Sequence, residues 1–176
     1  LLTFNEADVV KRMGQLRQAL SAFEAAGYVE RQGVVTHNLA LVYNDLGLAR
    51  RARRLLLQAA DIYRRTGAIG SLSVTLWVLS ELAAEAGDLR ASRAYVEEAI
   101  TLAEAVGDVR SASYRPLGLG RLALAEHDHA LAIAKLTEAS DILGGHDADA
   151  LHVSTLTLLA RAHLEAGDAV GALAAT

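Results

Sequence analysis

The chain has 176 residues, of which 52% are hydrophobic and 22% are charged, and its formal net charge is −4. This length and apolar content suffice for a sizeable core, whereas the net negative charge argues against general nucleic-acid binding. The sequence contains no cysteine, which excludes disulfides, thiolate metal sites and a cysteine nucleophile.

Apolar residues recur at the three- and four-residue spacing of helices along the whole chain, as in Leu39, Val42, Tyr43 and Leu46. In chain order, the predicted helices cover residues 8–26, 34–46, 48–65, 69–86, 88–106, 109–126, 128–143 and 148–166, and a last helix begins at 168. The sequence has no run of about 18 apolar residues, so no transmembrane helix is predicted.

Glycines mark the predicted helix ends, because a glycine past the last turn can adopt the left-handed conformation that ends a helix. One repeating slot holds Gly47, Gly87, His127 and Gly167, and a second holds Gly27, Gly67, Gly107 and Asp147. Three aspartates directly follow the first slot, namely Asp88, Asp128 and Asp168, whereas Leu48 stands there in the first complete repeat. These carboxylates are placed to accept hydrogen bonds from the first backbone N–H groups of the next helix.

A leucine followed by a small residue returns at a fixed interval. Leu39, Leu79, Leu119 and Leu159 stand 40 residues apart, and the residues after them are Ala40, Ser80, Gly120 and Ala160. Such a period indicates a solenoid of helix pairs, each burying its apolar face against its neighbours. We therefore predict a single repeat domain over residues 1–176, with a partial repeat at 1–27, repeats at 28–67, 68–107 and 108–147, and a partial repeat at 148–176.

Small residues and one proline bear on how the helices pack. The small residue after each repeated leucine is expected to let two helices approach closely and to place that leucine on the buried inner seam of the pair. Pro116 falls inside the helix predicted at 109–126, where it would break a hydrogen bond and bend the helix. If this helix starts near Ser113 instead, the proline stands in the first turn, where it is tolerated.

The two ends indicate a fragment. Residues 8–26 fit the second helix of a pair whose first helix is missing, apart from a stub near Leu1–Phe4, and the chain does not begin with methionine. A solenoid normally finishes with a capping element whose outer face is polar, and none is visible here. We therefore expect further repeats on both sides in a longer parent protein.

The repeat resembles the tetratricopeptide repeat in its Leu-small pair, its Gly-Asp turn and the second-helix alanines Ala52, Ala132 and Ala172. It departs from that family because only Tyr43 supplies the first-helix aromatic and because the period is 40 rather than about 34 residues. The resemblance implies an all-α, right-handed superhelical solenoid of antiparallel helix pairs.

Long-period repeats of this kind are similar to those in the C-terminal regions of large bacterial LuxR-type and ATPase transcriptional regulators, where the array is a sensor or docking domain. The resemblance implies a non-enzymatic scaffold that binds a protein or peptide, as the regulatory or sensor segment of a cytoplasmic bacterial signalling protein. It implies no cofactor, no direct nucleic-acid contact and no membrane contact. The alternatives are a structural spacer that self-associates through uncapped ends and a small-molecule sensor near Trp77 and Tyr114.

In such a superhelix the first helices line the concave face, and their residues that do not pack are candidates for partner binding. We predict these to be His37, Asn38, Leu41, Asn44, Trp77, Glu81, Tyr114, Arg121, Thr157 and Arg161. Asparagine can pair with backbone amides, arginine can bind a carboxylate through two hydrogen bonds, and tryptophan offers apolar area. Trp77 and Arg121 are the strongest candidates.

Two further groups of residues are possible sites. Arg50, Arg51, Arg53 and Arg54 form a basic run, which we expect to be a solvated convex face, with a docking patch for acidic partners as the alternative. The six histidines predict no metal site, because they fall in different repeats and no two stand four residues apart on one helix. No catalytic set of nucleophile, base and acid is apparent.

Overall fold

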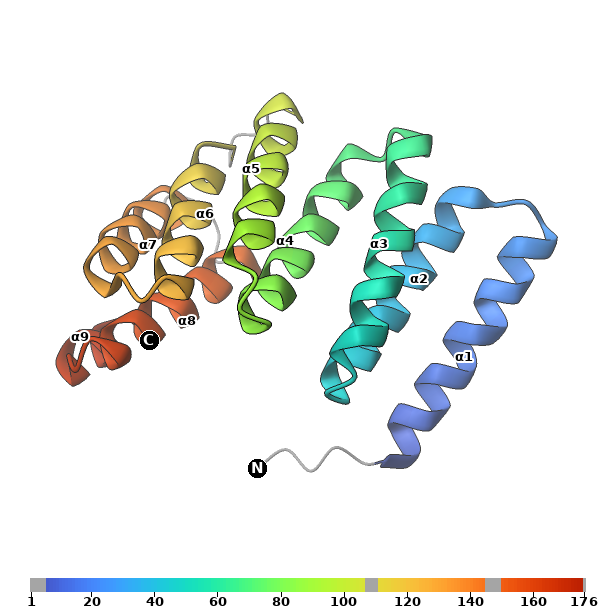
Figure 1. The fold of residues 1–176 in the computed structure, drawn as a ribbon, viewed down its shortest axis with the longest axis horizontal. Coiled ribbons are helices and arrows are strands. Elements are labelled where there is room, and N and C mark those ends of the chain that lie inside the picture. The colour runs from blue at the N-terminus through green and yellow to red at the C-terminus, as the bar shows by residue number, and fades with distance from the viewer. Residues whose placement is uncertain (1–5, 107–110, 145–149, 176) are drawn as a thin grey trace. The chain divides into compact units, whose positions relative to one another are not determined.

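The structure is a computed structural model that describes residues 6–106, 111–144 and 150–175 (Figure 1). Within these ranges it consists of nine α-helices and contains no strand. The first helices of the pairs are α2 (Val29–Asp45), α4 (Ile69–Glu85), α6 (Ser111–Ala125) and α8 (Ala150–Glu165). The second helices are α1 (Glu6–Ala25), α3 (Ala49–Thr66), α5 (Leu89–Val106), α7 (His129–Gly144) and α9 (Ala169–Ala174). None of these described helices is long and apolar enough to span a membrane.

The predicted order of helices is confirmed, and most ends fall close to the predicted residues. α2 begins at Val29 rather than at residue 34, so Gly33 lies inside the helix. A Cβ atom at Gly33 would stand 2.8 Å from Cε1 of Tyr63 on α3, so the missing side chain permits a close approach. The predictions for Gly107, Asp147 and the stub near Leu1–Phe4 lie outside the described residues.

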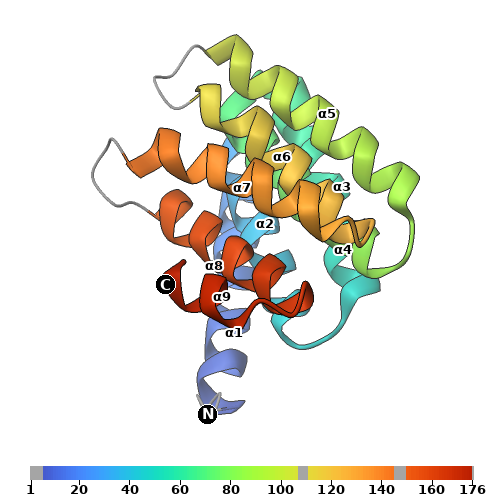
Figure 2. The same cartoon turned by 90° about the vertical axis from the view of Figure 1, so that its left-hand side faces the viewer.

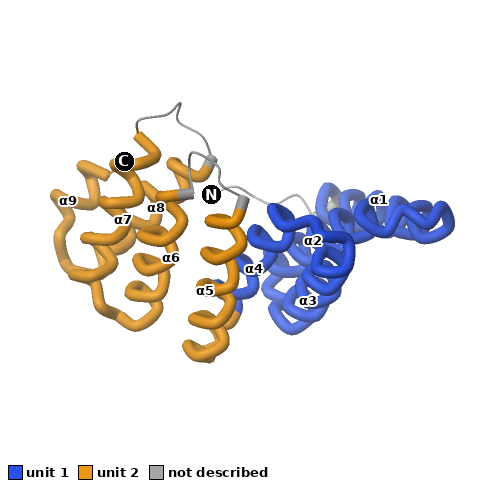
Figure 3. The backbone as a smooth tube through the Cα atoms, turned by 90° about the horizontal axis from the view of Figure 1, so that it is seen from above, with its two compact units in different colours: residues 1–82 blue, residues 83–176 orange. Residues whose placement is uncertain are grey.

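The chain divides into two compact units, residues 1–82 and 83–176, and the division falls inside α4 (Figure 3). In the first unit, α1 packs on α2 and α2 packs on α3. In the second unit, helices α5 to α9 each pack on the next one, and α6, α7 and α8 lie side by side (Figures 1 and 2). The prediction of one domain concerns both units together and stays a prediction.

The core of the first unit is formed by the apolar faces of its helices. Leu39, Val42 and Tyr43 of α2 are buried, as are Leu56 and Tyr63 of α3. Because buried residues recur every three or four positions, each helix turns one stripe of its surface to the core. This spacing is what made the helices predictable.

The core of the second unit joins α6, α7 and α8 around Leu117, Leu136 and Leu159. Gly120 lies at the tightest contact, since a Cβ atom there would stand 2.7 Å from Cγ of Leu136. The prediction that the small residue after the repeated leucine permits close helix packing is therefore confirmed at this pair.

The repeated leucine itself is buried at Leu39, Leu79 and Leu159, but Leu119 is 36% exposed. Ala112, Arg115 and Leu119 are all exposed on α6 and are spaced by three and four residues, so they form one solvent-facing stripe. The prediction that Leu119 belongs to the buried inner seam is therefore wrong, because α6 turns that residue outward and buries Leu117 instead.

The turns follow the predicted chemistry. Gly47, Gly87 and Gly167 have φ angles of 71°, 78° and 81°, so each adopts the left-handed conformation expected after a helix. The Oδ1 atoms of Asp88, Asp128 and Asp168 accept hydrogen bonds from backbone N–H groups of the following helix at 3.0, 3.1 and 2.9 Å. Leu48 precedes α3 without a side-chain cap.

Pro116 lies inside α6, as the first of the two predicted alternatives requires. The alternative start near Ser113 is wrong, because the described helix already includes Ser111. Having no N–H group, Pro116 cannot donate a helical hydrogen bond to the carbonyl of Ala112.

Candidate functional site

The predicted concave-face residues all lie on first helices. Those on α2 and α4 belong to the first unit, and those on α6 and α8 belong to the second. Trp77 and Tyr114, which the small-molecule hypothesis combines, are therefore in different units, and that hypothesis stays a prediction.

These residues differ in how accessible they are. Glu81, Thr157 and Arg161 are exposed, whereas the other predicted residues are half-buried. The Thr157 hydroxyl donates to a carbonyl of its own helix at 2.8 Å, and Arg161 Nε donates to Glu165 Oε1 at 2.6 Å. The two strongest candidates, Trp77 and Arg121, are half-buried and interact with other groups of the protein.

His37 is part of the packing between α2 and α4. Its Nδ1 lies 3.0 Å from Thr75 Oγ1, and the Thr75 hydroxyl donates its proton to the carbonyl of Ser71 at 2.8 Å. The Thr75 oxygen must therefore accept from His37, which assigns the proton of the neutral imidazole to Nδ1. Burial lowers the pKa of His37, because it disfavours the charged imidazolium.

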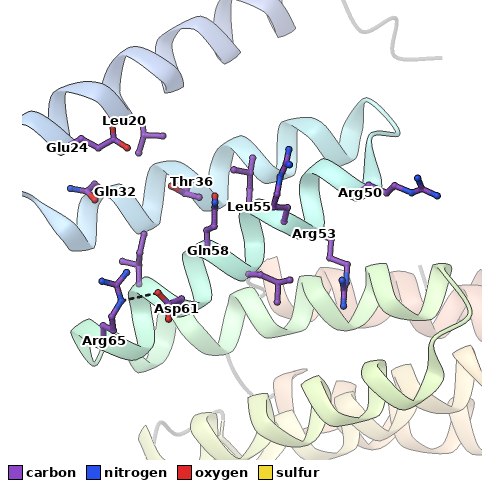
Figure 4. Close-up of a pocket in the computed structure, with 13 residues that line it drawn as sticks. Leu20, Glu24, Gln32, Thr36, Arg50, Arg53, Leu55, Gln58, Asp61 and Arg65 are labelled. Atoms are coloured by element: carbon purple, nitrogen blue, oxygen red, sulfur yellow. Dashed lines mark hydrogen bonds and ion pairs between the residues drawn. The ribbon is translucent and has the colours of Figure 1, made fainter.

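A groove of about 870 Å³ lies on the first unit and is lined by residues of α1, α2 and α3 (Figure 4). Leu20 and Glu24 line it from α1, and Gln32 and Thr36 from α2. α3 supplies the remaining side chains: Arg50, Arg53, Arg54, Leu55, Leu57, Gln58, Asp61, Ile62 and Arg65.

α3 positions the arginines because it has two different faces. Ala52, Leu56 and Ala59 recur at helical spacing and are fully buried against the core. Arg50 and Arg54 stand four residues apart on the exposed part of the same helix. Burial of the small and apolar residues therefore leaves these arginines on the exposed side of α3, where they line the groove.

The charges that line the groove are mainly positive. Arg50, Arg53, Arg54 and Arg65 face only two acidic residues, Glu24 and Asp61, among the lining side chains. Asp61 is already paired, since its Oδ2 accepts a hydrogen bond from Arg65 Nε at 3.0 Å. The pair is exposed, so it adds little stability, but it leaves Arg50, Arg53 and Arg54 to set the local charge.

Arg51, the remaining member of the basic run, has a separate role. Its guanidinium carbon lies 5.8 Å from the ring centroid of Tyr43, and the Tyr43 hydroxyl accepts a hydrogen bond from Arg17 at 2.8 Å. Two arginines from α1 and α3 therefore hold the aromatic residue of α2. All four arginines of the basic run are exposed, as expected of a solvated face; Arg51 also lies over a tyrosine ring, and the other three line the groove.

The basic run is visible in the sequence, but the groove is not. The run pointed to α3 alone, whereas the groove also needs Leu20 and Glu24 from α1. Outside the groove, the described residues contain one set that could hold a metal ion, made of His127, His129 and Glu165. Glu165 comes from the next repeat, which histidine spacing cannot reveal.

The helix pairs, the glycine-ended turns and the close packing at small residues define the class of this protein, a helical repeat scaffold. Residues 32–105 match the family model described as the tetratricopeptide repeat. This matched segment therefore resembles tetratricopeptide repeats, and repeats of this kind are generally non-catalytic scaffolds that mediate protein interactions.

Solved structures have the same fold. BtubC (BKLC) from P. vanneervenii is similar over 97% of this chain and 74% of its own, with a TM-score of 0.68 and 19% identity. A kinesin light chain-like protein with nearly identical TPR-like repeats from Podosopora anserina is similar over 96% of this chain and 84% of its own, with a TM-score of 0.64 and 18% identity. At these identities the likeness concerns the fold alone. No curated protein is similar enough to count as a relative.

Proposed function

We propose that the chain is a protein-binding scaffold whose groove on α1, α2 and α3 holds an acidic, partly apolar segment of a partner protein. The observation that carries this proposal is the groove itself, which Arg50, Arg53 and Arg54 line beside apolar side chains. Guanidinium groups bind carboxylates through paired, charge-assisted hydrogen bonds, so glutamate and aspartate side chains suit them.

The rest of the lining favours a peptide over other anions. Leu20, Leu55 and Ile62 offer apolar area, and Gln32 and Gln58 can donate to and accept from a peptide backbone. Glu24 adds a negative charge at the same groove, which disfavours a uniformly negative polymer such as a nucleic acid. A segment that alternates carboxylates with apolar residues matches this mixture.

In this proposal the chain is the docking segment of a larger bacterial signalling or transcription-regulating protein, as its resemblance to the repeats of LuxR-type and ATPase regulators suggests. The concave-face residues of each unit, Trp77 among those of the first and Arg121 among those of the second, stay candidates for contacts with the same partner. Self-association of the chain stays a prediction.

A labelled peptide that alternates glutamate and leucine tests the groove by fluorescence anisotropy. We expect it to bind more tightly than a matched peptide with glutamine for glutamate, and its affinity to fall with added salt. Exchange of the three groove arginines, R50Q/R53Q/R54Q, should weaken binding at least about tenfold, since hydrogen bonds between charged groups contribute about 1.5–3 kcal/mol each.

The matched control is Arg90→Gln, which removes one exposed arginine from α5 in the second unit. It should bind the acidic peptide as the unaltered chain does, and circular dichroism should show all variants equally helical. Equal affinity for both peptides, or full affinity in the triple variant, would contradict the proposal.

A further inference from the structure

The turn between α6 and α7 differs from its counterparts in the residue that ends the first helix. Gly47, Gly87 and Gly167 occupy this slot in the other turns, but here it holds His127 with a φ angle of 60°. A residue with a Cβ atom pays about 1–2 kcal/mol to adopt the left-handed conformation. A histidine kept in a strained position points to a role for its side chain.

Within the second unit, this turn lies beside a group of three side chains of types that can bind a metal ion. His127 and His129 flank Asp128, and Glu165 reaches them from the end of α8. One ligand atom of each of the three residues lies within 4.8 Å of the others. The two imidazole rings meet edge to face with centroids 6.1 Å apart, so they are neighbours without being stacked.

His129 contributes to this cluster a ring nitrogen, Nδ1, whose hydrogen bonding is not satisfied. Its Nδ1 is buried and, among the described residues, has no hydrogen-bond partner. The carboxylate oxygen Glu165 Oε2 stands 3.7 Å from this nitrogen, beyond hydrogen-bond distance. A buried polar atom without a partner carries a desolvation cost of about 1–3 kcal/mol, which a bound cation would remove.

We infer that His127, His129 and Glu165 form a binding site for a divalent transition-metal ion of the zinc type. Two imidazoles and one carboxylate are a ligand set that zinc accepts at about 2.0–2.2 Å, with a further position left for water or a partner's side chain. Ligand atoms around such an ion stand roughly 3.4 Å apart, so modest side-chain rotations would close the present spacing.

The surroundings already orient the carboxylate. Arg161 Nε donates to Glu165 Oε1 at 2.6 Å, which leaves Oε2 directed at His129. A residue that hydrogen-bonds a metal ligand in this way fixes the orientation of that ligand. A bound ion would tie the α6–α7 turn to the end of α8, and so link the third repeat to the fourth.

Isothermal titration of the metal-free full chain with zinc chloride tests this site. We expect one strong site per chain and a higher thermal midpoint with zinc, because an ion that binds only the folded state stabilises it. Cobalt chloride should give visible absorption bands that identify nitrogen and oxygen ligands.

Three variants decide where the ion binds. His127→Gly restores the glycine of the other turns, so it should fold normally yet bind zinc at least about tenfold more weakly, and Glu165→Gln should do the same. His152→Gln removes a histidine that instead lies 3.2 Å from the Ser140 hydroxyl, and it should leave zinc binding unchanged. Absence of zinc binding in the unaltered chain, or full binding in both H127G and E165Q, would overturn the site.

Discussion

At the scale of single residues, the turn between α2 and α3 lacks the capping aspartate that stands before α5, α7 and α9. Asp88, Asp128 and Asp168 each cap a helix, whereas Leu48 precedes α3 with no side-chain hydrogen bond to it. The Arg51 N–H, which corresponds to the N–H groups that those aspartates accept from, donates to the Leu48 carbonyl at 2.9 Å instead, so no side chain caps α3. Leu48 is also 41% exposed, so its side chain contributes little to the core.

Leu48→Asp should restore the cap and raise the free energy of unfolding by about 1 kcal/mol. Urea denaturation of the variant and the unaltered chain measures this difference. Leu48→Ala is the control, because it removes the leucine without adding an acceptor, and it should not be stabilising. An L48D variant that is no more stable than L48A would contradict the capping argument.

His37 makes stability depend on pH in a defined direction. Burial lowers the pKa of His37 in the folded chain. When the pH is below the ordinary pKa of histidine, the unfolded chain therefore binds more protons at this residue than the folded chain does. This contribution is therefore complete above about pH 6.5 and is lost as the pH falls toward the lowered pKa. We expect the thermal midpoint to drop more between about pH 7.5 and 5.5 in the unaltered chain than in His37→Gln, whose amide can still donate to Thr75.

The comparison between these two chains isolates His37 from the other histidines, which both chains keep. Scanning calorimetry at matched ionic strength supplies the midpoints. If the thermal midpoints of the two chains fall equally as the pH is lowered, His37 does not make stability depend on pH.

At the scale of helices, glycine is used in two opposite ways. A Cβ atom at Gly120 would stand 2.7 Å from Cγ of Leu136 and 3.3 Å from the Leu136 backbone nitrogen, so α6 and α7 touch there. At Gly14 on α1, no atom lies within 4 Å of the position of such a Cβ atom. The first glycine is required by packing, and the second only weakens its helix.

Gly120→Ala should therefore destabilise the chain by about 1–3 kcal/mol, as overpacked cores do. Gly14→Ala, the same exchange in open space, should stabilise it by roughly 0.5–1 kcal/mol. Denaturation midpoints of the two variants measure the contrast. A stable G120A variant would mean that α7 can move away from α6 without cost.

The helices could be predicted because their signals are local. Apolar spacing, the glycine slots and the capping aspartates each act within a few residues of one helix, and they recur in every repeat. The exposure of Leu119 could not be read from the same pattern, because it depends on how α6 is turned about its own axis. The groove and the proposed metal site could not be predicted either, because each combines side chains from segments that are separated in sequence.

At the scale of the whole chain, the candidate sites lie where the repeat is broken. The residues that recur hold the scaffold together, and they say little about a partner. The departures are the arginines at the start of α3, which line a groove, and His127 in a glycine slot, which joins His129 and Glu165. A repeat protein can change such positions freely because each unit keeps its own packing.

A nuclear magnetic resonance titration of the isotope-labelled chain with the glutamate-leucine peptide tests most directly whether the groove binds a partner segment. If the peptide binds in the groove, we expect shifts concentrated on the backbone amides around Leu20, Gln32 and residues 50–65, and a loss of those shifts in R50Q/R53Q/R54Q. Shifts confined to the predicted concave-face residues of α4, α6 and α8, with the groove amides unmoved, would contradict binding in the groove.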